Sequence, residues 1–575
     1  MNLDRILVEE VGQWGRFQLR AVVLCALVII MGALQCYAYL FILVKVKTRT
    51  DFRCVIPECE NSSTATFAPP WILDAVPSSG DFLDNCHRYV TTSIAGNTSD
   101  CPAELFDTNS TLQCEEYVYE HKNSAFYEFN LACDDFLPTL VGSVNTLGMM
   151  VCLPITGLIS DRYGRRLALA LTNFNLAWIG TLTYFAGSYT SYISLSFLTN
   201  LFGSCYFSCA YILGNKFAVL ANLAIQCIIV IKYMIAALEY VGPKYRVVIG
   251  SSMSTCLAIG KMLLGPIVWM EPYWRHLILI IYLPLFVFVI YFWIAPESVR
   301  WLISKGRYQD ALDILIGAAE MNRRSLREKT INYFKGVKDI ETKIEDISEP
   351  WLICLVFKYK PILLRCVVTP IWWISSILMY YGLTICSIGI SGNKYLNYSA
   401  TIAVEIPGYW IAVLLLDRIG RKAVLVTGFW ITGACQVAFI FISKGNYWLS
   451  LSVYLIGKMC IAGVTTSLYV YTAELFPTRY RSSLLSYCSM MGRVGGILAP
   501  LMPGLAAVVW VHLPFLVFGV LALGSGLLVL LVPETLGAPL PDSMEEAAGL
   551  GMEAPGVMQH LRTLVFRSKS YTIRY

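Results

Sequence analysis

The chain has 575 residues, of which 56% are hydrophobic and 14% are charged, and its formal net charge is +5. Because about a quarter of the residues in a soluble protein are charged, this chain has too little polar surface to cover several water-exposed domains. Its basic residues do not form long runs, which excludes the electrostatic footprint of a nucleic-acid-binding protein. Much of the chain is therefore expected to lie in lipid.

A membrane-spanning helix contains about 20 consecutive, mostly apolar residues, and thirteen stretches of this kind recur along the chain. They are 21–43, 137–159, 167–186, 192–213, 217–238, 247–270, 277–295, 366–388, 400–416, 423–442, 448–472, 484–509 and 513–532. The predicted fold class is an all-α polytopic membrane protein.

Short basic loops predict the orientation of these helices, because such loops stay in the cytoplasm. Basic clusters follow three of the stretches, at 161–166, 417–422 and 477–481. The first segment, 1–20, carries Arg5, Arg16 and Arg20. It leads into an apolar stretch that is too long for a signal-peptide core. We therefore expect segment 1–20 and the tail 533–575 to lie in the cytoplasm.

The segment 45–135 is polar and acidic, with 15 Asp or Glu against 6 Lys or Arg. It holds six cysteines and three glycosylation sequons, namely Cys54, Cys59, Cys86, Cys101, Cys114, Cys133, Asn61, Asn97 and Asn109. An even cysteine count opposite the basic loops predicts an extracellular subdomain with disulfides. The connectivity is left open, and free thiols in a disordered loop are the alternative.

A second polar segment, 296–365, contains 13 Lys or Arg against 10 Asp or Glu. Apolar residues recur at helical spacing in 308–321, which predicts amphipathic cytoplasmic helices. The segment joins the two apolar halves of the chain, 21–295 and 366–532, either as a solvated linker or as a regulatory element.

Three sequence motifs recur in the same order in both halves, which indicates an internal duplication of a six-helix unit. Asp161-Arg-Tyr-Gly-Arg165 recurs as Asp417-Arg-Ile-Gly-Arg421. Glu239 and Arg246 recur, with the same spacing, as Glu474 and Arg481. Pro296-Glu-Ser298 recurs as Pro533-Glu-Thr535.

The first half carries 21 extra residues, because Asp161 and Glu239 are 78 positions apart whereas Asp417 and Glu474 are 57 apart. The excess is expected at 214–236. A complete extra crossing would place the matching motifs on opposite sides of the membrane. We therefore expect a re-entrant or over-long helix, or a segment absent from the functional protein, such as an unremoved intron. Its lysines, Lys216 and Lys232, are interpreted as accidental.

These motifs resemble those of a known family. The basic loop after Gly157 and its second-half repeat resemble the loop motif of the major facilitator superfamily. The long acidic loop, Glu474-Leu-Phe-Pro-Thr478 and Pro533-Glu-Thr-Leu-Gly537 resemble the organic cation, organic anion and carnitine transporters of solute carrier family 22. The resemblance extends to about Ala547, apart from the insertion. It implies twelve helices in two six-helix bundles, a central cavity and alternating access.

Alternating access requires contacts that hold the bundles together on one side and are released when the other side closes. Eight charged residues of the repeated motifs, here called the latch residues, are candidates for these contacts: Asp161, Arg165, Glu239, Arg246, Asp417, Arg421, Glu474 and Arg481. We expect them to form a cytoplasmic latch in the outward-facing state. The alternative is that they fix topology and cap helix ends.

Charged side chains inside the apolar stretches bear on the substrate, because they are costly in lipid. Besides Lys232 of the expected insertion, four stand out: Lys261, Glu405, Lys458 and Arg493. In the resembled family, anion and carnitine carriers have an arginine before a Gly-Gly pair in the penultimate helix, where cation carriers have an aspartate. The sequence Gly492-Arg493-Val-Gly-Gly496 matches the first pattern. Because arginine binds a carboxylate bidentately, an organic anion or a carnitine-like zwitterion is favoured.

The remaining candidates for substrate binding are Glu405, Lys458 and three aromatic residues, Trp373, Tyr380 and Tyr381. Glu405 is expected to receive an ammonium group, and the aromatic rings to stack on flat rings or cations. Alternatively, Glu405 and Arg493 neutralise each other, and the aromatic residues face lipid or pack. Lys261 is expected to snorkel towards an interface.

No motif of a hydrolase, a nucleotide-binding protein or a zinc enzyme occurs in the sequence. We therefore expect a plasma-membrane transporter of small organic ions, with no enzymatic activity, cofactor or metal. The lipid bilayer and the substrate are the expected partners, and the coupling ion and oligomeric state are left open. The alternatives are an organic cation transporter, a sugar-porter-like facilitator and a non-transporting receptor.

Overall fold

The computed structural model describes most of the chain. The described residues are 6–12, 15–43, 52–60, 67, 69–79, 82–91, 101, 103–119, 123–131, 133–134, 136–163, 165–203, 246–290, 293, 297, 299–336, 352–442, 446–477, 480–538, 541 and 543–550. The predicted span 217–238, the predicted insertion 214–236, Lys216, Lys232 and Glu239 lie outside them.

The first group of helices, here called the N-bundle, comes from the first half of the chain. It contains α2 (Arg16–Ala33), continued by η2 (Leu34–Tyr37) and α3 (Ala38–Ile42), then α6 (Leu137–Tyr163), α7 (Arg165–Leu182), η4 (Thr183–Phe185), α8 (Tyr189–Gly203), α11 (Arg246–Met270), and α12 (Trp274–Tyr282), which continues as η7 (Leu283–Ile290). In this group α8 packs on α6 and α7, and α2 packs on α11.

The second group, here called the C-bundle, comes from the second half. It contains α18 (Lys360–Cys386), η9 (Ser387–Gly389), α19 (Lys394–Ala403), α20 (Glu405–Ile419), α21 (Arg421–Phe441), α22 (Tyr447–Leu475), α23 (Arg481–Leu498), η10 (Ala499–Leu501), α24 (Met502–Val508) and α25 (Leu513–Val529). Here α18 packs on α23, and α21 packs on both α22 and α25.

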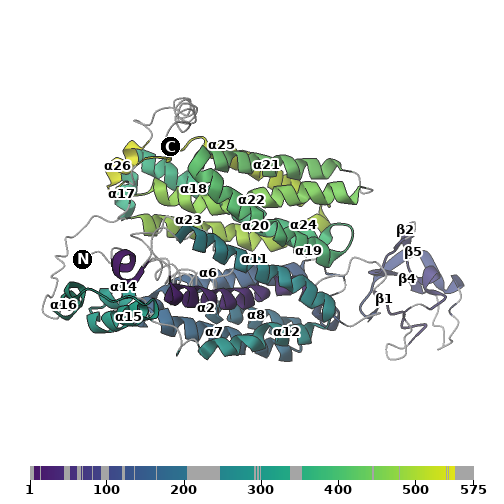
Figure 1. Ribbon diagram of the computed structural model, residues 1–575. Coiled ribbons are helices and arrows are strands. Elements are labelled where there is room, and N and C mark those ends of the chain that lie inside the picture. The colour runs from purple at the N-terminus through teal and green to yellow at the C-terminus, as the bar shows by residue number, and fades with distance from the viewer. Residues whose placement is uncertain are drawn as a thin grey trace, which may run out of the picture.

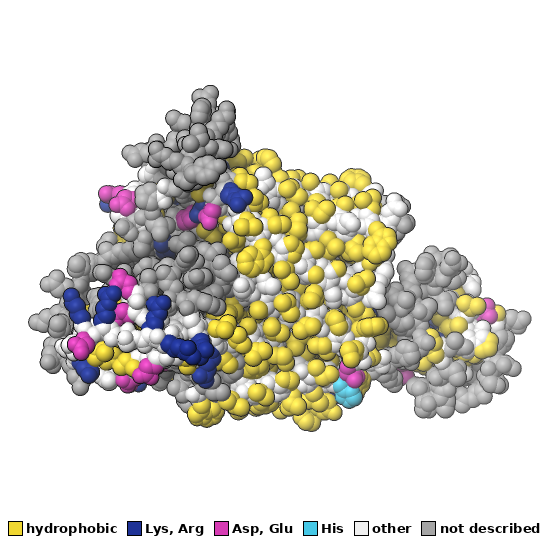
Figure 2. All heavy atoms as spheres, viewed as in Figure 1, with side chains coloured by type: hydrophobic (Ala, Val, Ile, Leu, Met, Phe, Trp, Pro, Cys, Tyr) yellow, Lys and Arg dark blue, Asp and Glu magenta, His cyan; other side chains and the backbone are white. Residues whose placement is uncertain are grey.

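Seven of these helical segments are long and apolar enough to cross a membrane: Arg16–Ile42, Ser251–Met270, Lys360–Gly389, Lys394–Ile419, Arg421–Phe441, Tyr447–Leu475 and Ser483–Val508. Shorter apolar helices cover Leu137–Cys152, Trp274–Ile290 and Leu513–Val529. Figure 1 shows the two groups of roughly parallel helices, and Figure 2 shows hydrophobic side chains covering their outer face. The predicted all-α polytopic fold is confirmed.

The acidic loop forms three two-stranded antiparallel sheets beyond one end of the bundles, here called the loop end (Figure 1). The strands are β1 (Phe52–Cys54) with β6 (Tyr117–Tyr119), β2 (Ser78–Ser79) with β3 (Phe82–Leu83), and β4 (His87–Thr91) with β5 (Phe106–Gln113). Short helical elements accompany them, namely η3 (Ala103–Leu105), α4 (Ile72–Ala75) and α5 (Ala125–Glu128). The sequon residue Asn109 is exposed on β5, whereas Asn61 and Asn97 lie outside the described residues.

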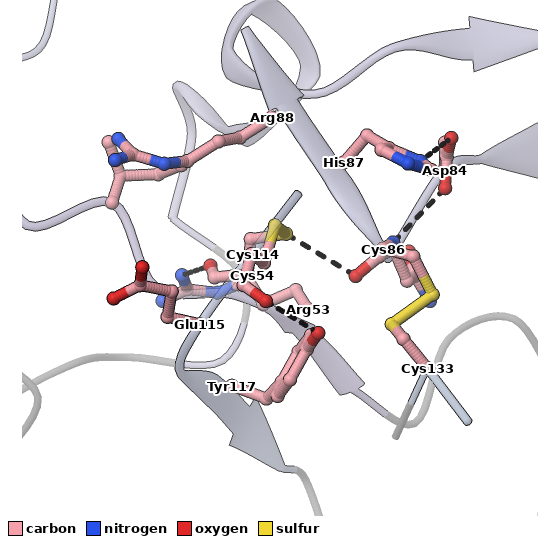
Figure 3. Close-up of a disulfide and its surroundings, with 12 residues drawn as sticks. Arg53, Cys54, Asp84, Cys86, His87, Arg88, Cys114, Glu115, Tyr117 and Cys133 are labelled. Carbon is pink, nitrogen blue, oxygen red and sulfur yellow. Dashed lines mark hydrogen bonds and ion pairs between the residues drawn. A yellow bond between two sulfur atoms is a disulfide. The ribbon is translucent and has the colours of Figure 1, made fainter. Parts of the chain in front are cut away.

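Three disulfides hold these small sheets together, which confirms the predicted oxidised cysteines and supplies their connectivity. They join Cys54 to Cys114, Cys59 to Cys101, and Cys86 to Cys133. Figure 3 shows the bond between Cys86 and Cys133. The first two lie in a small apolar cluster that includes Ile56, Val76 and Phe106. Sheets this short bury too little apolar surface to be stable alone, so the cross-links stabilise the subdomain.

The polar segment between the bundles forms short helices at the opposite end, here called the linker end (Figure 1). They are α14 (Val299–Ser304), α15 (Tyr308–Met321), α16 (Glu328–Gly336) and α17 (Leu352–Lys358). The helix expected at 308–321 is therefore confirmed as α15. The chain's first element, η1 (Leu7–Gly12), packs on α15, and Glu10 accepts a hydrogen bond from the Thr330 hydroxyl at 2.8 Å. At the same end Arg365 donates to the Ala547 carbonyl oxygen of α26 (Met544–Gly549) at 2.6 Å.

Candidate functional site

Glu405 lies at the junction of α19 and α20, near the middle of one membrane-length segment, Lys394–Ile419. Pro407 is tolerated there because it falls in the first turn of α20, where a missing N–H costs no helical hydrogen bond. Gly408 lets α20 approach α22 closely, since an added Cβ would lie 2.5 Å from the Met459 carbonyl oxygen. The sequence thereby places an acidic side chain, with 0% exposure, between packed helices.

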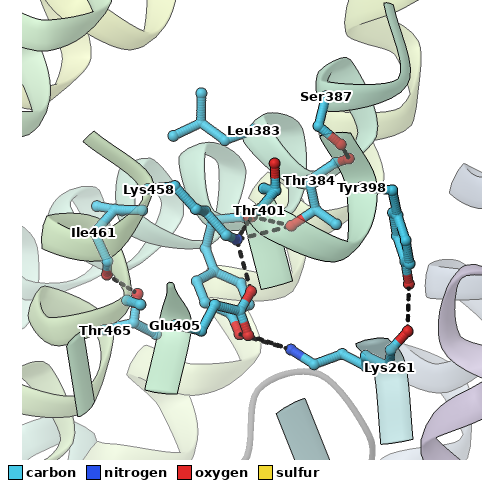
Figure 4. A network of polar contacts seen from close by, with 12 residues as sticks. Lys261, Leu383, Thr384, Ser387, Tyr398, Thr401, Glu405, Lys458, Ile461 and Thr465 are labelled. Carbon is cyan, nitrogen blue, oxygen red and sulfur yellow. Dashed lines mark hydrogen bonds and ion pairs between the residues drawn. The ribbon is translucent and has the colours of Figure 1, made fainter. Parts of the chain in front are cut away.

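Two lysines from different helices neutralise Glu405 (Figure 4). The ammonium of Lys261, on α11, donates to Oε2 of Glu405. The ammonium of Lys458, on α22, lies 2.9 Å from Oε1. Both lysine side chains have 0% exposure, which is tolerable in a membrane protein because buried charges pair with one another.

Two tyrosines complete the shell around the carboxylate. The Tyr380 hydroxyl donates to Oε2 of Glu405 at 2.7 Å, and the Tyr409 hydroxyl does so at 2.9 Å. The face of the Tyr380 ring also lies near both ammonium groups, 3.7 Å from Lys458 Nζ and 5.4 Å from Lys261 Nζ. An aromatic face near a carboxylate is a favourable environment for a cation.

The two lysines differ in how they are held. Lys458 also donates to the Tyr380 carbonyl oxygen and to the Thr384 hydroxyl, both at 2.7 Å, so all its partners belong to the C-bundle. Lys261 comes from the N-bundle and reaches across to Glu405 and the Tyr380 hydroxyl, the latter at 3.0 Å. The expectation that Lys261 snorkels to an interface was wrong, because the bundle interior supplies a counterion.

Arg493, on α23, lies in a second buried group beside α18. It is 2% exposed and interacts with the Tyr381 hydroxyl. Tyr381 directly follows Tyr380 on α18. The Tyr380 hydroxyl donates to Glu405, and the Tyr381 hydroxyl interacts with Arg493. Glu405 is thus paired with lysines, and the alternative pairing with Arg493 is not observed.

The glycines around Arg493 explain its position between the bundles. An added Cβ at Gly495 would lie 2.3 Å from the Ile374 carbonyl oxygen of α18, which shows how tightly α23 and α18 pack. At Gly496 it would lie 3.1 Å from Thr146 on α6, in the N-bundle. The Gly-rich sequence after Arg493 therefore brings its helix against both bundles.

Trp373 is fully buried within the C-bundle and does not face lipid. Its indole N–H donates to the Thr472 hydroxyl at 3.1 Å, and its ring packs edge-to-face on Tyr469, with ring centroids 4.5 Å apart. The two rings therefore support each other beside the Arg493 helix.

The bundles pack against each other at the loop end. Phe41 of α3 contacts Tyr395 and Tyr398 of α19, with ring centroids 5.9 and 5.1 Å apart. The Ser143 hydroxyl of α6 donates to the Ile497 carbonyl oxygen of α23 at 2.7 Å. Aromatic packing and a direct hydrogen bond thus close this end.

At the linker end, the described latch residues form a network within the C-bundle. Arg421 Nε lies 3.1 Å from Oε2 of Glu474, and Arg421 Nη2 lies 3.2 Å from Oδ1 of Asp417. The Thr535 hydroxyl donates to Glu474 at 2.5 Å. Arg481 is buried and donates to the Phe476 carbonyl oxygen at 3.4 Å. The side chains of Asp161, Arg165 and Arg246, like all of Glu239, lie outside the described residues.

A small polar cavity of about 30 Å³ lies inside the N-bundle, with Gln35, Asn145 and Asn200 in its lining. Water needs roughly 10–15 Å³, so this volume suits one or two waters and is too small for an organic ion. The described residues therefore point to the charged groups between the bundles as the candidate site.

Sequence reasoning missed several residues of this site. Tyr409 lies four residues after Glu405, on the same helical face, and this spacing was a usable signal. Tyr37 and Tyr398 pack together near the same group, with ring centroids 6.1 Å apart. They come from different bundles, so no local pattern in the sequence links them.

The sequence profile of the family described as "Sugar (and other) transporter" matches residues 106–546. The organic cation transporter protein of Drosophila melanogaster is 30% identical over 96% of this chain and 95% of its own length. Solute carrier family 22 member 1 of Oryctolagus cuniculus is 30% identical, with 96% of each chain covered. Solute carrier family 22 member 3 of Mus musculus is 28% identical, with 95% of each covered.

Solved structures support the same fold at low sequence identity. A partially occluded, inward-open structure of the Escherichia coli xylose transporter XylE aligns with a TM-score of 0.53 and 14% identity, over 91% of this chain and 100% of the transporter. A second, inward-open structure of XylE aligns with a TM-score of 0.51 and 14% identity, over 71% of this chain and 89% of the transporter.

Proposed function

The chain belongs to solute carrier family 22 of the major facilitator superfamily, and we propose that it carries small organic cations across the plasma membrane by alternating access. The sequence-based preference for an anion or a carnitine-like zwitterion finds no support in the relatives, since the Drosophila relative is named as an organic cation transporter. We therefore rank an organic cation as the first candidate substrate.

The surroundings of Glu405 carry this proposal. Its carboxylate is fully buried between the bundles and already binds ammonium groups. The Tyr380 ring and the hydroxyls of Tyr380 and Tyr409 surround the same position. A carboxylate combined with an aromatic face is the arrangement that recognises organic ammonium ions.

Alternating access is supported by the way the bundles meet. In the described residues, direct contacts across the bundle interface include Phe41 on Tyr395 and Ser143 on Ile497, both at the loop end. A rocking transporter alternates between two states, each with one end closed and with the binding site near mid-membrane. A closed loop end corresponds to one of these states. The latch residues then hold the linker end in the other state.

The distribution of charges, disulfides and sequons supports the proposed orientation and domain organisation. Lys and Arg side chains gather over the linker-end helices (Figure 2), as expected of a cytoplasmic face. Disulfides and the exposed sequon at Asn109 lie at the loop end, as expected of an extracellular face. We place the segment 1–20, the linker 296–365 and the tail 533–575 in the cytoplasm.

Arg493 favours a second candidate, a zwitterion whose carboxylate binds Arg493 while its ammonium binds Glu405. The observation behind it is that the two charged groups interact with consecutive residues of α18, Glu405 with Tyr380 and Arg493 with Tyr381. A carboxylate bound by Arg493 would be held by charge-assisted hydrogen bonds.

Uptake by cells that express the protein tests both candidates. The probes are a labelled quaternary ammonium ion, an aromatic carboxylate and a trimethylammonium carboxylate zwitterion, applied to the wild type, Glu405→Gln and Arg493→Gln, with surface expression measured in parallel. The primary proposal predicts uptake of the quaternary ammonium that Glu405→Gln abolishes and Arg493→Gln retains. Uptake of the carboxylate alone would overturn it. Uptake of the zwitterion alone, lost in both variants, would establish the second candidate.

A further inference from the structure

The ion pair between Lys261 and Glu405 crosses the interface between the bundles. Lys261 lies on α11 of the N-bundle and Glu405 on α20 of the C-bundle. The backbone is tied across at the same level, because the Tyr398 hydroxyl of α19 donates to the Lys261 carbonyl oxygen at 3.1 Å (Figure 4). Lys261 is therefore held in place at the point where its ammonium reaches the carboxylate.

The Lys261 ammonium is an alkylammonium ion, and it lies at the Glu405 carboxylate, where the ammonium group of a substrate is expected to bind. Its partners are Oε2 of Glu405 and the Tyr380 hydroxyl, and the Tyr380 ring lies 5.4 Å away. These are the groups that the proposed function assigns to an organic cation. One side chain of the protein thus already occupies the cation site.

Charge counting shows that Lys261 and a substrate cation exclude each other. Glu405, Lys458 and Lys261 together carry one net positive charge in a place where all three side chains have 0% exposure. A bound cation would add a second positive charge, and uncompensated charge in such an environment is costly. Lys458 and Glu405 belong to the same bundle, where the Tyr380 carbonyl, the Tyr380 ring and the Thr384 hydroxyl also hold Lys458. Lys261 belongs to the other bundle, so a movement of the bundles relative to each other separates Lys261, and not Lys458, from the carboxylate.

We propose that Lys261 is a built-in competitor of the substrate: its ammonium occupies the cation site of the empty carrier, and a bound organic cation displaces it from Glu405. This inference rests on the proposed function. One ammonium replaces another at Oε2, so no proton moves. Because the displaced pair joins the two bundles, substrate binding breaks an ionic contact between them, which couples occupancy of the site to bundle movement.

The first test compares the wild type with two variants of Lys261 in uptake of a labelled quaternary ammonium ion. In Lys261→Met the competitor is gone, so KM falls by about tenfold or more, as expected when a close competing charge pair is lost. In Lys261→Arg the charge is kept, but the planar guanidinium group binds the Glu405 carboxylate more strongly than an ammonium does. KM therefore rises. A purely long-range charge effect would leave KM of Lys261→Arg unchanged, and this result would overturn the proposal.

Lys360→Met, which removes the charge of an exposed lysine at the linker-end start of α18, is the matched control, and the distance between the bundles is the quantity measured. Labels are placed on two exposed loop-end positions, Gly187→Cys in the N-bundle half and Ser391→Cys in the C-bundle half, and their distance is measured with and without the quaternary ammonium. The ligand should change the distance in the wild type and in Lys360→Met. Lys261→Met should show the changed distance without ligand. If Lys261→Met instead responds like the wild type, the proposal fails.

The two proposals fail in different ways. No uptake of the quaternary ammonium by the wild type removes the proposed function. Normal uptake by the wild type, with an unchanged or raised KM in Lys261→Met, removes the competitor role of Lys261 alone.

Discussion

The Lys261 ammonium on α11 donates to Glu405 on α20, so one buried ion pair joins the two bundles near the middle of the membrane. A buried pair adds little net stability compared with well-packed apolar residues, but loss of one partner leaves a charge without its counterion. Removal of Glu405 affects two ammonium groups at once, because Lys458 shares the carboxylate. This asymmetry leads to the first prediction.

Glu405→Gln should destabilise the protein by roughly 3–5 kcal/mol, the usual cost of breaking a buried pair. The double variant Lys261→Met with Glu405→Gln should be less destabilised than the sum of the single variants, because it removes one of the two ammonium groups that lost their counterion. Thermal unfolding of the purified protein measures the cycle. Additive effects would contradict direct coupling of Lys261 and Glu405.

Glu474 and Asp417 both pair with Arg421, but their exposure differs. The Glu474 side chain is 9% exposed and is also bonded to the Thr535 hydroxyl, whereas Asp417 is 76% exposed. Glu474→Gln should therefore lower the unfolding temperature clearly, whereas Asp417→Asn should change stability by about 0–1 kcal/mol.

The latch proposal adds a conformational effect to the Glu474 variant. Loss of this charge should favour the state with the linker end open, which is measured as faster labelling of linker-end cysteines by a thiol reagent. Asp417→Asn is the matched control on the same arginine. Unchanged labelling in Glu474→Gln would contradict the latch proposal and would show that Glu474 and Arg421 have only a structural role within the C-bundle.

The helices and the charged candidates were predictable from the sequence because each depends on local patterns. Apolar length predicts the spans, and helical spacing gave α15 as 308–321. Charges in apolar stretches singled out Glu405 and Lys458. Their partnership was not predictable, because the two residues lie on different helices and only packing brings them together. The same reason explains why Lys261 was expected at an interface.

The cysteine pairing shows the same limit. The even count in an acidic loop predicts oxidation, but the pairs Cys54 with Cys114 and Cys59 with Cys101 are 60 and 42 positions apart. The strand register of β1 with β6 places Cys54 opposite Tyr117. No single-sequence pattern specifies that register, so the sequence left the connectivity open.

Gly265 on α11 is required for close packing of the bundles at the loop end. An added Cβ would lie 2.4 Å from the Ser399 hydroxyl and 3.2 Å from the Tyr395 carbonyl oxygen, both on α19. Gly265→Ala should cost about 1–3 kcal/mol through overpacking and should separate α11 from α19. Gly524→Ala is the control, because its Cβ would meet nothing within 4 Å. Equal unfolding temperatures for the two variants would contradict the role of Gly265.

Removal of the buried Cys54 to Cys114 disulfide should unfold part of the loop subdomain. The bond closes a separation of 60 residues, and loss of such a cross-link typically costs about 2–5 kcal/mol. In the Cys54→Ala, Cys114→Ala double variant, limited proteolysis should cut the loop while the helices stay intact. Cys435→Ala, which changes a cysteine of α21 that forms no disulfide, should not change the cleavage pattern. Resistance of the double variant would show that the remaining disulfides suffice.

The Glu58 carboxylate should make the loop subdomain sensitive to acid. Burial alone would raise the pKa of Glu58. The hydrogen bond from Arg88, whose Nη1 lies 2.6 Å away, a backbone hydrogen bond, the charge of Arg88 and a hydrogen bond with Thr91 together outweigh burial and lower the pKa below its usual value. A lowered folded-state pKa means that the pair stabilises the fold above the ordinary glutamate pKa, and that this contribution is lost as pH falls through the folded pKa. The pair joins the turn after β1 to β4, so the effect should appear there.

Hydrogen–deuterium exchange of peptides from 52–60 and 87–91, corrected for the intrinsic pH dependence of exchange, measures this effect. In the wild type, protection should decrease as the pH falls below the ordinary glutamate pKa. In Glu58→Gln, protection should be lower at neutral pH and should change less on acidification. Asp107, whose pKa is lowered mainly by the Ser110 hydroxyl, is present in both proteins, so the difference between them isolates Glu58. Identical pH profiles would show that Glu58 and Arg88 do not stabilise the subdomain.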